Sequence, residues 1–131
     1  MDTEKIMGWM IWGEAEGESI EGKIAVAQVA LNRYRLANRP SYAITWWGKS
    51  LEEILLHPQQ FQGLARVKDL QSLPPLDCYT VAQVAMGDYL QPIVDSATHF
   101  VQIDHDGFKG SPSYTFVRVV GNHAFYRENY L

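Results

Sequence analysis

Two helical patterns of this chain meet at Trp12-Gly13-Glu14-Ala15-Glu16-Gly17-Glu18, a segment with three carboxylates within five residues. A glutamate in the last turn of a helix faces the negative end of the helix dipole, so folding gains nothing from placing it there. Repulsion among neighbouring acids favours the protonated form of a carboxyl group. A carboxylic acid that stays neutral near pH 7 suits a general acid. The alternative is a solvated acidic turn, in which Glu18 and Glu21 simply favour the start of the next helix.

Helical periodicity extends to both sides of this segment. Residues 3–16 are expected to form a first helix that Thr3 caps, with an apolar face that includes Ile6 and Met10. Ser19 is expected to cap a second helix over about 19–35. Its apolar stripe repeats at helical spacing through Ile20, Ile24, Ala27 and Leu31. Small residues along this second helix indicate close packing and full burial.

The remainder of the chain predicts two further helices and then strands. Ser50-Leu51-Glu52-Glu53 is a capping box that opens a short helix to about Leu56. Pro74-Pro75 precedes a helix from about Leu76 to Tyr89. Past Pro92, residues 97–103 are rich in β-formers, residues 113–120 alternate like a half-buried strand, and Gly121-Asn122 predicts a hairpin that returns over 123–126. The chain is therefore expected to be a single α+β domain over residues 1–131, with a small antiparallel sheet near its C-terminus.

Composition and charge exclude several classes of function. With 131 residues, 47% of them hydrophobic, the chain can bury a core. Its net charge of −4 arises mainly before Gly22, where six acids face Lys5 alone, and it has no run of Lys or Arg, which argues against nucleic-acid binding. Its apolar runs are too short to span a membrane. Asp2 and Glu4 lie where a signal peptide would be basic, so we expect a soluble monomer made in the cytoplasm without an export signal.

Metal and thiol chemistry find little support in the sequence. The four histidines lack a short ligand pair such as His-Glu-x-x-His. Asp104-His105-Asp106-Gly107 resembles only the start of a calcium loop, and a plain β-turn is the better interpretation. Cys78 excludes an internal disulfide, and a single cysteine at a helix start favours a core position over a nucleophile. No metal or cofactor is expected.

Aromatic and amide side chains gather in the predicted loops and near the sheet. Sugar rings bind by stacking on aromatic faces and by hydrogen bonds to amides and hydroxyls, so this mixture suits a carbohydrate groove, although packing in the core is the default for any one aromatic residue. The residues are Trp12, Trp46, Trp47, Phe61, Tyr114, Phe125 and Tyr126, beside Gln60, Gln62, Asn122 and His123.

Several blocks of this sequence together resemble the SleB-type cell wall hydrolases, which are the spore-cortex lytic enzymes and their phage relatives. The first block is Glu14-Ala-Glu-Gly-Glu18 followed by Glu21-Gly22-Lys23-Ile-Ala-Val-Ala-Gln-Val-Ala-Leu-Asn32-Arg33. The others are Gln60-Phe61-Gln62, Ala97-Thr98-His99-Phe100 and Gly121-Asn122-His123-Ala124-Phe125-Tyr126. They follow the family's order and cover nearly the whole chain. The chain departs from the family pattern at Glu16, where the family usually has arginine.

This resemblance implies a lysozyme-like fold, in which a helical lobe and a small β lobe flank a cleft. It implies peptidoglycan as substrate, cut at the β-1,4 bond between N-acetylmuramic acid and N-acetylglucosamine, with Glu14 as the catalytic acid. A lytic transglycosylase needs only this carboxylate. A hydrolytic muramidase would need a second one, for which Glu16 and Glu18 are the neighbouring candidates. Residues expected to contact the substrate are Glu18, Phe61, Gln62, Thr98, His123 and Tyr126.

Other functions stay open at this stage. The chain could be a catalytically inactive peptidoglycan-binding module, or a Cys- or metal-dependent peptidase acting on the stem peptide. The lack of a leader within this sequence favours a phage endolysin that accumulates in the cytoplasm and reaches the wall through a membrane pore. A virion-associated lysin, or a bacterial enzyme whose leader is missing, would look the same.

Overall fold

A computed structural model describes residues 1–39, 47–58, 60–103 and 113–129 of the chain. In chain order, the described elements are α1 (Thr3–Ala15), α2 (Ile20–Ala37), α3 (Leu51–Leu56), the short 3-10 helix η1 (Gln62–Arg66), α4 (Leu76–Met86), and the strands β1 (His99–Gln102), β2 (Tyr114–Val120) and β3 (His123–Glu128). Helices come first and the sheet follows, so the predicted α+β class is confirmed. None of the helices in these ranges is long and apolar enough to cross a membrane.

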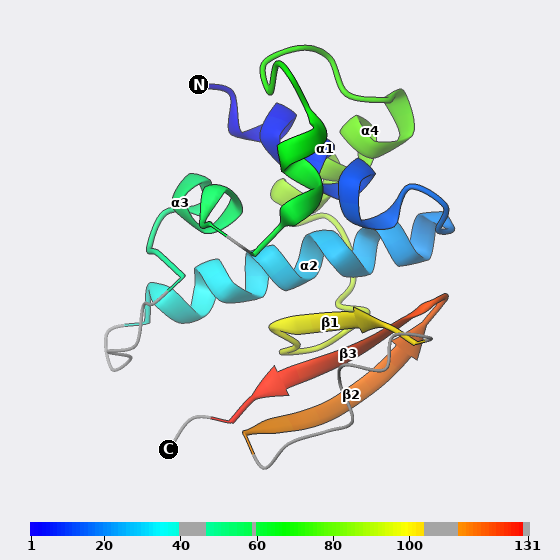
Figure 1. Ribbon diagram of the computed structural model, residues 1–131. Helices are drawn as coiled ribbons and strands as arrows, with labels where there is room; N and C mark the ends of the chain where they lie inside the picture. The colour runs from blue at the N-terminus through cyan, green and yellow to red at the C-terminus, as the bar shows by residue number, and fades with distance from the viewer. Residues whose placement is uncertain (40–46, 59, 104–112, 130–131) are drawn as a thin grey trace.

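Helix α2 is the central element of the fold. Figure 1 shows α2 crossing the middle of the molecule, with α1, α3 and α4 on one side and the three-stranded sheet on the other. Both sides of a central helix must be buried, and Val26 and Val29 are indeed fully enclosed. Ala25, Ala27 and Ala30 are also fully buried, and their small side chains let the neighbouring elements approach α2 closely. The predicted second helix is thereby confirmed.

The caps of the helices agree with the sequence patterns except at the first helix. Ser19 caps α2 by accepting a hydrogen bond from the Gly22 amide at 3.3 Å, and both arms of the predicted capping box are present at α3. The predicted cap at Thr3 is wrong. Asp2 caps α1 instead, since its carboxylate accepts the Glu4 amide at 3.0 Å. Ile20 also departs from the predicted stripe and is 53% exposed, because it lies in the first turn of α2.

Two further boundaries differ from the sequence prediction. Helix α4 ends at Met86 rather than near Tyr89, because Gly87 takes the C-cap position and donates to the Gln83 carbonyl. Residues 62–66 form the single turn of η1, which the sequence patterns did not predict. The predicted turn at 104–107 lies outside the described residues, as does Trp46.

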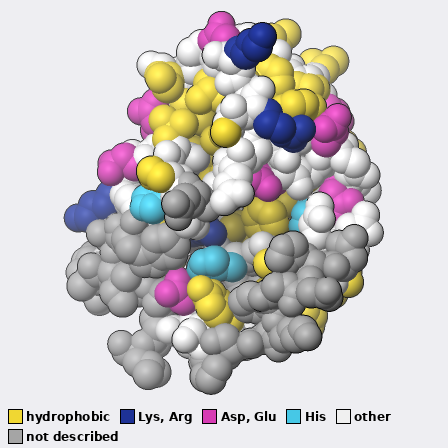
Figure 2. All heavy atoms as spheres, in the orientation of Figure 1, with side chains coloured by type: hydrophobic (Ala, Val, Ile, Leu, Met, Phe, Trp, Pro, Cys, Tyr) yellow, Lys and Arg dark blue, Asp and Glu magenta, His cyan; other side chains and the backbone are white. Residues whose placement is uncertain are grey.

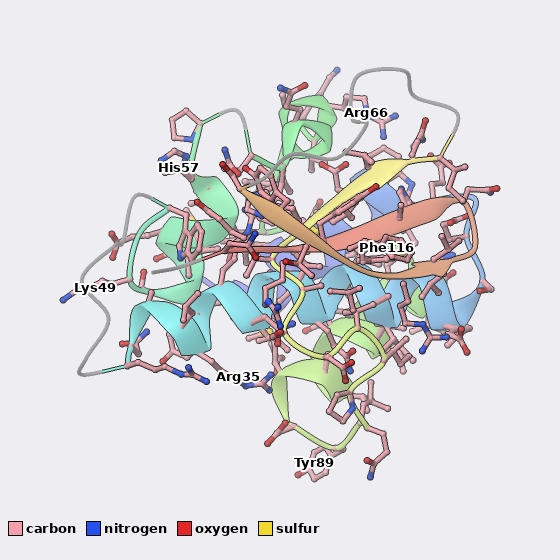
Figure 3. The ribbon with its side chains drawn as sticks, turned by 90° about the horizontal axis from the view of Figure 1, so that it is seen from below. Arg35, Lys49, His57, Arg66, Tyr89 and Phe116 are labelled. Atoms are coloured by element: carbon pink, nitrogen blue, oxygen red, sulfur yellow. The ribbon has the colours of Figure 1, made fainter. Side chains whose placement is uncertain are left out.

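The sheet is antiparallel with the order β1-β3-β2, so the last strand is its centre. Pairing of β2 with β3 shifts register between Phe116 and Arg118, which inserts Val117 as a bulge. An inserted residue changes which side chains face the core. The alternation predicted along residues 113–120 is therefore not found: within β2 only Val120 is buried, and Phe116 is 56% exposed on the sheet (Figure 3).

Candidate active site

Glu14 lies in the last turn of α1 and is half-buried. Burial is the main influence on its side chain and raises the pKa of the carboxyl group above its ordinary value. Two smaller effects act in the opposite direction. The Gly63 amide donates a hydrogen bond to Glu14 Oε1 at 3.3 Å, and the positive charge of Arg66 is nearby. A carboxyl group with a raised pKa retains a proton at a pH where an exposed glutamate has lost it.

Arg66 and Lys23 stabilise the end of helix α1 beside this carboxyl group. Arg66 lies 4.6 Å from the centre of the Trp12 ring and donates to the Gly13 carbonyl at 3.3 Å. The Lys23 ammonium, which is buried, donates to the carbonyls of Glu18 at 2.5 Å and Glu16 at 3.4 Å. Cations at a helix C-terminus offset its negative dipole end. The acidic segment is thus held by positive charge rather than left as a solvated turn.

A pocket of about 240 Å³ opens beside Glu14. Its walls come from the α1–α2 turn and from the sheet, with the lining residues Gly13, Glu14, Ala15, Glu16, Gly17, Glu18, Gln102, Asn122 and His123. Figure 2 shows acidic and histidine side chains at the edge of a hollow in the middle of this face, below the helical part. Larger surface grooves of about 680 Å³ lie near α3 and contain neither Glu14 nor its neighbours.

Glu18 joins the helical part to the tip of the β2–β3 hairpin. Its Oε1 accepts the Asn122 amide at 2.7 Å and its Oε2 accepts the Asn122 side chain at 3.0 Å. The Glu18 side chain is only 7% exposed. The hairpin turns at Gly121 with φ +58°, and a Cβ there would lie 2.7 Å from Glu18 Oε1. Both the backbone conformation and the closeness of the carboxylate therefore require glycine at this position.

His123 borders the same pocket from the start of β3 and is almost fully buried. Burial lowers the pKa of its imidazole, an effect that Glu18 partly opposes. Its Nδ1 lies 3.2 Å from Glu18 Oε1, within ion-pair distance, but the direction does not satisfy a hydrogen bond. The Glu18–Asn122 hydrogen bonds are therefore the firm contact here, and the imidazole is neutral near pH 7.

The other predicted contact residues occupy different environments. Gln62 is exposed at the start of η1, directly before Gly63. Tyr126 is half-buried on the central strand, its ring 5.7 Å from Phe116. Phe61 and Thr98 are 4% and 1% exposed, so in this conformation they support the cleft from within rather than face a ligand. Only Glu18 and His123 of the predicted contacts line the pocket with Glu14.

Thr98 belongs to a buried polar network that sequence reasoning missed. Its carbonyl accepts Arg33 Nε at 2.7 Å, and its hydroxyl accepts the Glu128 amide at 3.0 Å and lies 2.9 Å from His99 Nδ1. Arg33 also donates to the Gln60 side chain at 3.1 Å. Burial and Arg33 lower the pKa of His99 to about 4. The signal for this network in the sequence was the Leu31-Asn32-Arg33 motif in α2. It was not interpretable alone, because the partners of Arg33 lie far along the chain.

Gln102, Gly63 and Arg66 are further residues of the site that the sequence did not identify. The sequence patterns placed Asn122 in the hairpin turn and among the amides beside the aromatic residues, but they did not predict the hydrogen bonds of Asn122 to Glu18. Neither of the other chemistries considered gains support. Cys78 is buried, and burial together with Asp77 raises the pKa of its thiol to about 12. No cluster of three His, Cys, Asp or Glu that could hold a metal occurs within the described ranges.

The chain thus has a lysozyme-like α+β fold, with a half-buried glutamate of raised pKa at a pocket between a helical part and a small sheet. The chain belongs to the Cell Wall Hydrolase family, whose model matches residues 17–126. That match begins after Glu14, so the assignment of Glu14 depends on the motif resemblance and on the site geometry. No curated protein sequence matches the chain.

Two solved structures share the fold. The catalytic domain of the Bacillus cereus SleB protein has a TM-score of 0.74 and 21% identity, over 95% of this chain and 89% of that one. The catalytic domain of the germination-specific lytic transglycosylase SleB from Bacillus anthracis has a TM-score of 0.75 and 21% identity, over 95% of this chain and 93% of that one. The expected SleB-type family and lysozyme-like fold are confirmed.

Proposed function

We propose that this chain is a lytic transglycosylase that cuts the β-1,4 bond between N-acetylmuramic acid and N-acetylglucosamine and leaves a 1,6-anhydro-muramyl end. One observation carries the proposal: Glu14 is a half-buried carboxyl group with a raised pKa, and it lines a pocket between the helices and the sheet. Family membership and the SleB lytic transglycosylase that shares the fold support it.

Glu14 acts first as a general acid. Its proton passes to the glycosidic oxygen as the bond from that oxygen to C1 of the muramyl sugar breaks, and the N-acetylglucosamine leaves as an alcohol. General-acid catalysis of this kind contributes about 10²–10⁴-fold to the rate. The raised pKa keeps the proton on the Glu14 carboxyl group at a higher pH than an exposed glutamate would allow.

The same carboxylate then acts as a base. It takes the proton of the C6 hydroxyl of the muramyl sugar, and O6 bonds to C1 to close the 1,6-anhydro ring. The proton lost in the first step is regained in the second, so the enzyme is restored and no water is consumed. One carboxylate is enough for this sequence of steps.

The surroundings of the two neighbouring acids favour this route over hydrolysis. A glycosidase that adds water needs a second carboxylate about 5 Å or about 6.5–9.5 Å from the first. Both oxygens of Glu18 already accept hydrogen bonds from Asn122, which leaves the carboxylate poorly placed to activate water or attack a sugar. Glu16 is exposed at the C-cap of α1. For the sugar contacts we propose exposed Gln62, half-buried Tyr126 and the pocket-lining His123.

Mass spectrometry of fragments released from purified peptidoglycan tests this function. Wild-type protein is expected to release anhydro-muramyl ends, and Glu14→Gln none. Glu21→Gln serves as a matched control, because it neutralises an exposed acid in the first turn of α2. Reducing ends from the wild type would instead establish a hydrolase, and Glu16→Gln and Glu18→Gln would then identify its second carboxylate. No release by the wild type would support a binding module, and full activity of Glu14→Gln would refute the role of Glu14.

For the biological setting we propose a phage endolysin, a proposal that follows only from the resemblance to the phage relatives of the family. Expression in a bacterial cytoplasm is expected to leave cells intact until a pore-forming membrane protein is co-expressed, and to lyse them promptly afterwards. Lysis without the pore would contradict this setting while leaving the proposed chemistry untouched.

A further inference from the structure

Helix α1 and η1 meet at two glycines whose backbones are in direct contact. A Cβ placed on Gly63 would lie 2.7 Å from the C, Cα and O atoms of Gly13, and a Cβ on Gly13 would lie 2.9 Å from the C and Cα atoms of Gly63. Neither glycine has a positive φ, so backbone conformation does not call for glycine at either position. Both are small because the two segments need to approach this closely.

This contact brings a backbone donor to the catalytic carboxyl group. The Gly63 amide reaches Glu14 Oε1 at 3.3 Å, a bond between residues 49 positions apart. Arg66, at the end of the same short helix, holds the carbonyl of Gly13 and covers the Trp12 ring. Figure 3 shows the Arg66 side chain projecting from η1. Within the described ranges, no hydrogen bond reaches Oε2 of Glu14.

We propose that the Gly13–Gly63 contact makes Gly63 a positioning residue, whose amide holds Glu14 Oε1 as an acceptor and thereby places the transferable proton on Oε2. This inference deepens the proposed function and rests on it. A neutral carboxyl group has one oxygen that only accepts and one that carries hydrogen. An N–H aimed at Oε1 repels a proton there, so the proton resides on Oε2, the oxygen that is free to meet the glycosidic oxygen.

Nuclear magnetic resonance of the intact chain tests the contact without relying on catalysis. The Gly63 amide resonance is expected to shift with pH at the same midpoint as the side-chain carboxyl carbon of Glu14. That shift should vanish in Glu14→Gln, whereas the amide of Gly87, at the end of α4, serves as the reference. A Gly63 amide that stays constant while the Glu14 carboxyl titrates would overturn the proposal.

Gly63→Ala tests the catalytic consequence. Its added Cβ would lie 2.7 Å from the Gly13 backbone and must push η1 away from α1. A misplacement of about 1 Å at a catalytic group costs on the order of 10²-fold, so we expect kcat/KM to fall by about that factor. The lost hydrogen bond from the residue 63 amide had lowered the pKa of Glu14, so the basic limb of the pH–rate profile should move to higher pH, which a purely structural defect would not cause. Ala65→Ser, an exposed change in the same turn, is the control and should leave both quantities unchanged.

The outcomes separate this inference from the function on which it rests. A folded Gly63→Ala protein with an unmoved basic limb would overturn the positioning role, even if Glu14→Gln were inactive. If Gly63→Ala does not fold, the resonance measurement on the wild type decides. An active Glu14→Gln would refute the proposed acid, whereas coupled titration of Gly63 and Glu14 would still hold.

Discussion

Replacing Glu18 with alanine should remove the connection between the helical part and the hairpin. The wild-type carboxylate accepts one hydrogen bond from the Asn122 amide at 2.7 Å and another from its side chain at 3.0 Å. A hydrogen bond to a charged group contributes about 1.5–3 kcal/mol. Asn122 is exposed, so water replaces the lost acceptor and the lower value applies to each bond. We therefore expect the free energy of unfolding to fall by about 3 kcal/mol.

Urea unfolding at pH 7, followed by tryptophan fluorescence, measures this loss. Glu16→Ala is the matched control, because that side chain is exposed two residues away, and it should change the free energy of unfolding by less than about 0.5 kcal/mol. Asn122→Ala removes only the side-chain donor and should cost about 1.5 kcal/mol. In the double variant Glu18→Ala/Asn122→Ala, the loss of unfolding free energy should be smaller than the sum of the two single losses, because both changes remove the same side-chain hydrogen bond. A loss below about 1 kcal/mol in Glu18→Ala, or strict additivity, would refute the reasoning.

Three further predictions follow from the buried groups. Arg33→Lys should lower the free energy of unfolding in urea by about 1–3 kcal/mol, because an ammonium cannot hold Thr98 and Gln60 together as the guanidinium does; an unchanged midpoint would contradict this. The pKa of His99 lies at about 4 in the native state against 6.5 ordinarily, so the unfolded chain binds more protons between these pH values. Stability present above pH 6.5 should thus be lost as the pH falls to about 4, by up to about 1.4 kcal/mol per pH unit, and His99→Gln should flatten that part of a series of urea titrations. Cys78 should resist thiol reagents until the protein unfolds, because its thiol is buried and has a raised pKa. Cys78→Ala should keep its activity on peptidoglycan, and an inactive variant would instead support the thiol-dependent peptidase.

The geometry explains why the proposed catalytic carboxyl group lies at an unfavourable helix position. Glu14 is half-buried at the negative end of α1, where a charge would be repelled by the dipole and deprived of water. Both effects favour the neutral acid, which the proposed first step requires. The cost of the acidic segment is offset nearby, because buried Lys23 binds the carbonyls of Glu16 and Glu18. Strain at a reacting group balanced by contacts around it is common at active sites.

Local patterns in the sequence were reliable where neighbours in the chain supply the physics. The apolar repeat of α2 and the capping box at Ser50 each involve residues within a few positions, and both were predicted correctly except that Ile20 is exposed. The first cap was placed one residue too late, at Thr3 rather than Asp2, since both side chains can cap a helix and only the backbone decides. Alternation along β2 failed at Val117, because a bulge depends on the partner strand.

By itself, the sequence determined the helices, the late hairpin, the α+β class and the acidic segment that contains Glu14. Only the tertiary structure decided what that segment does, because its partners come from distant parts of the chain. Glu18 binds Asn122 across 104 positions, and Glu14 receives the Gly63 amide across 49. Hydrophobic periodicity repeats along a helix or strand, and capping involves residues a few positions apart, so both can be recognised in the sequence alone. A single hydrogen bond between distant residues leaves no repeating pattern, and it forms only once packing around α2 has brought the two ends together.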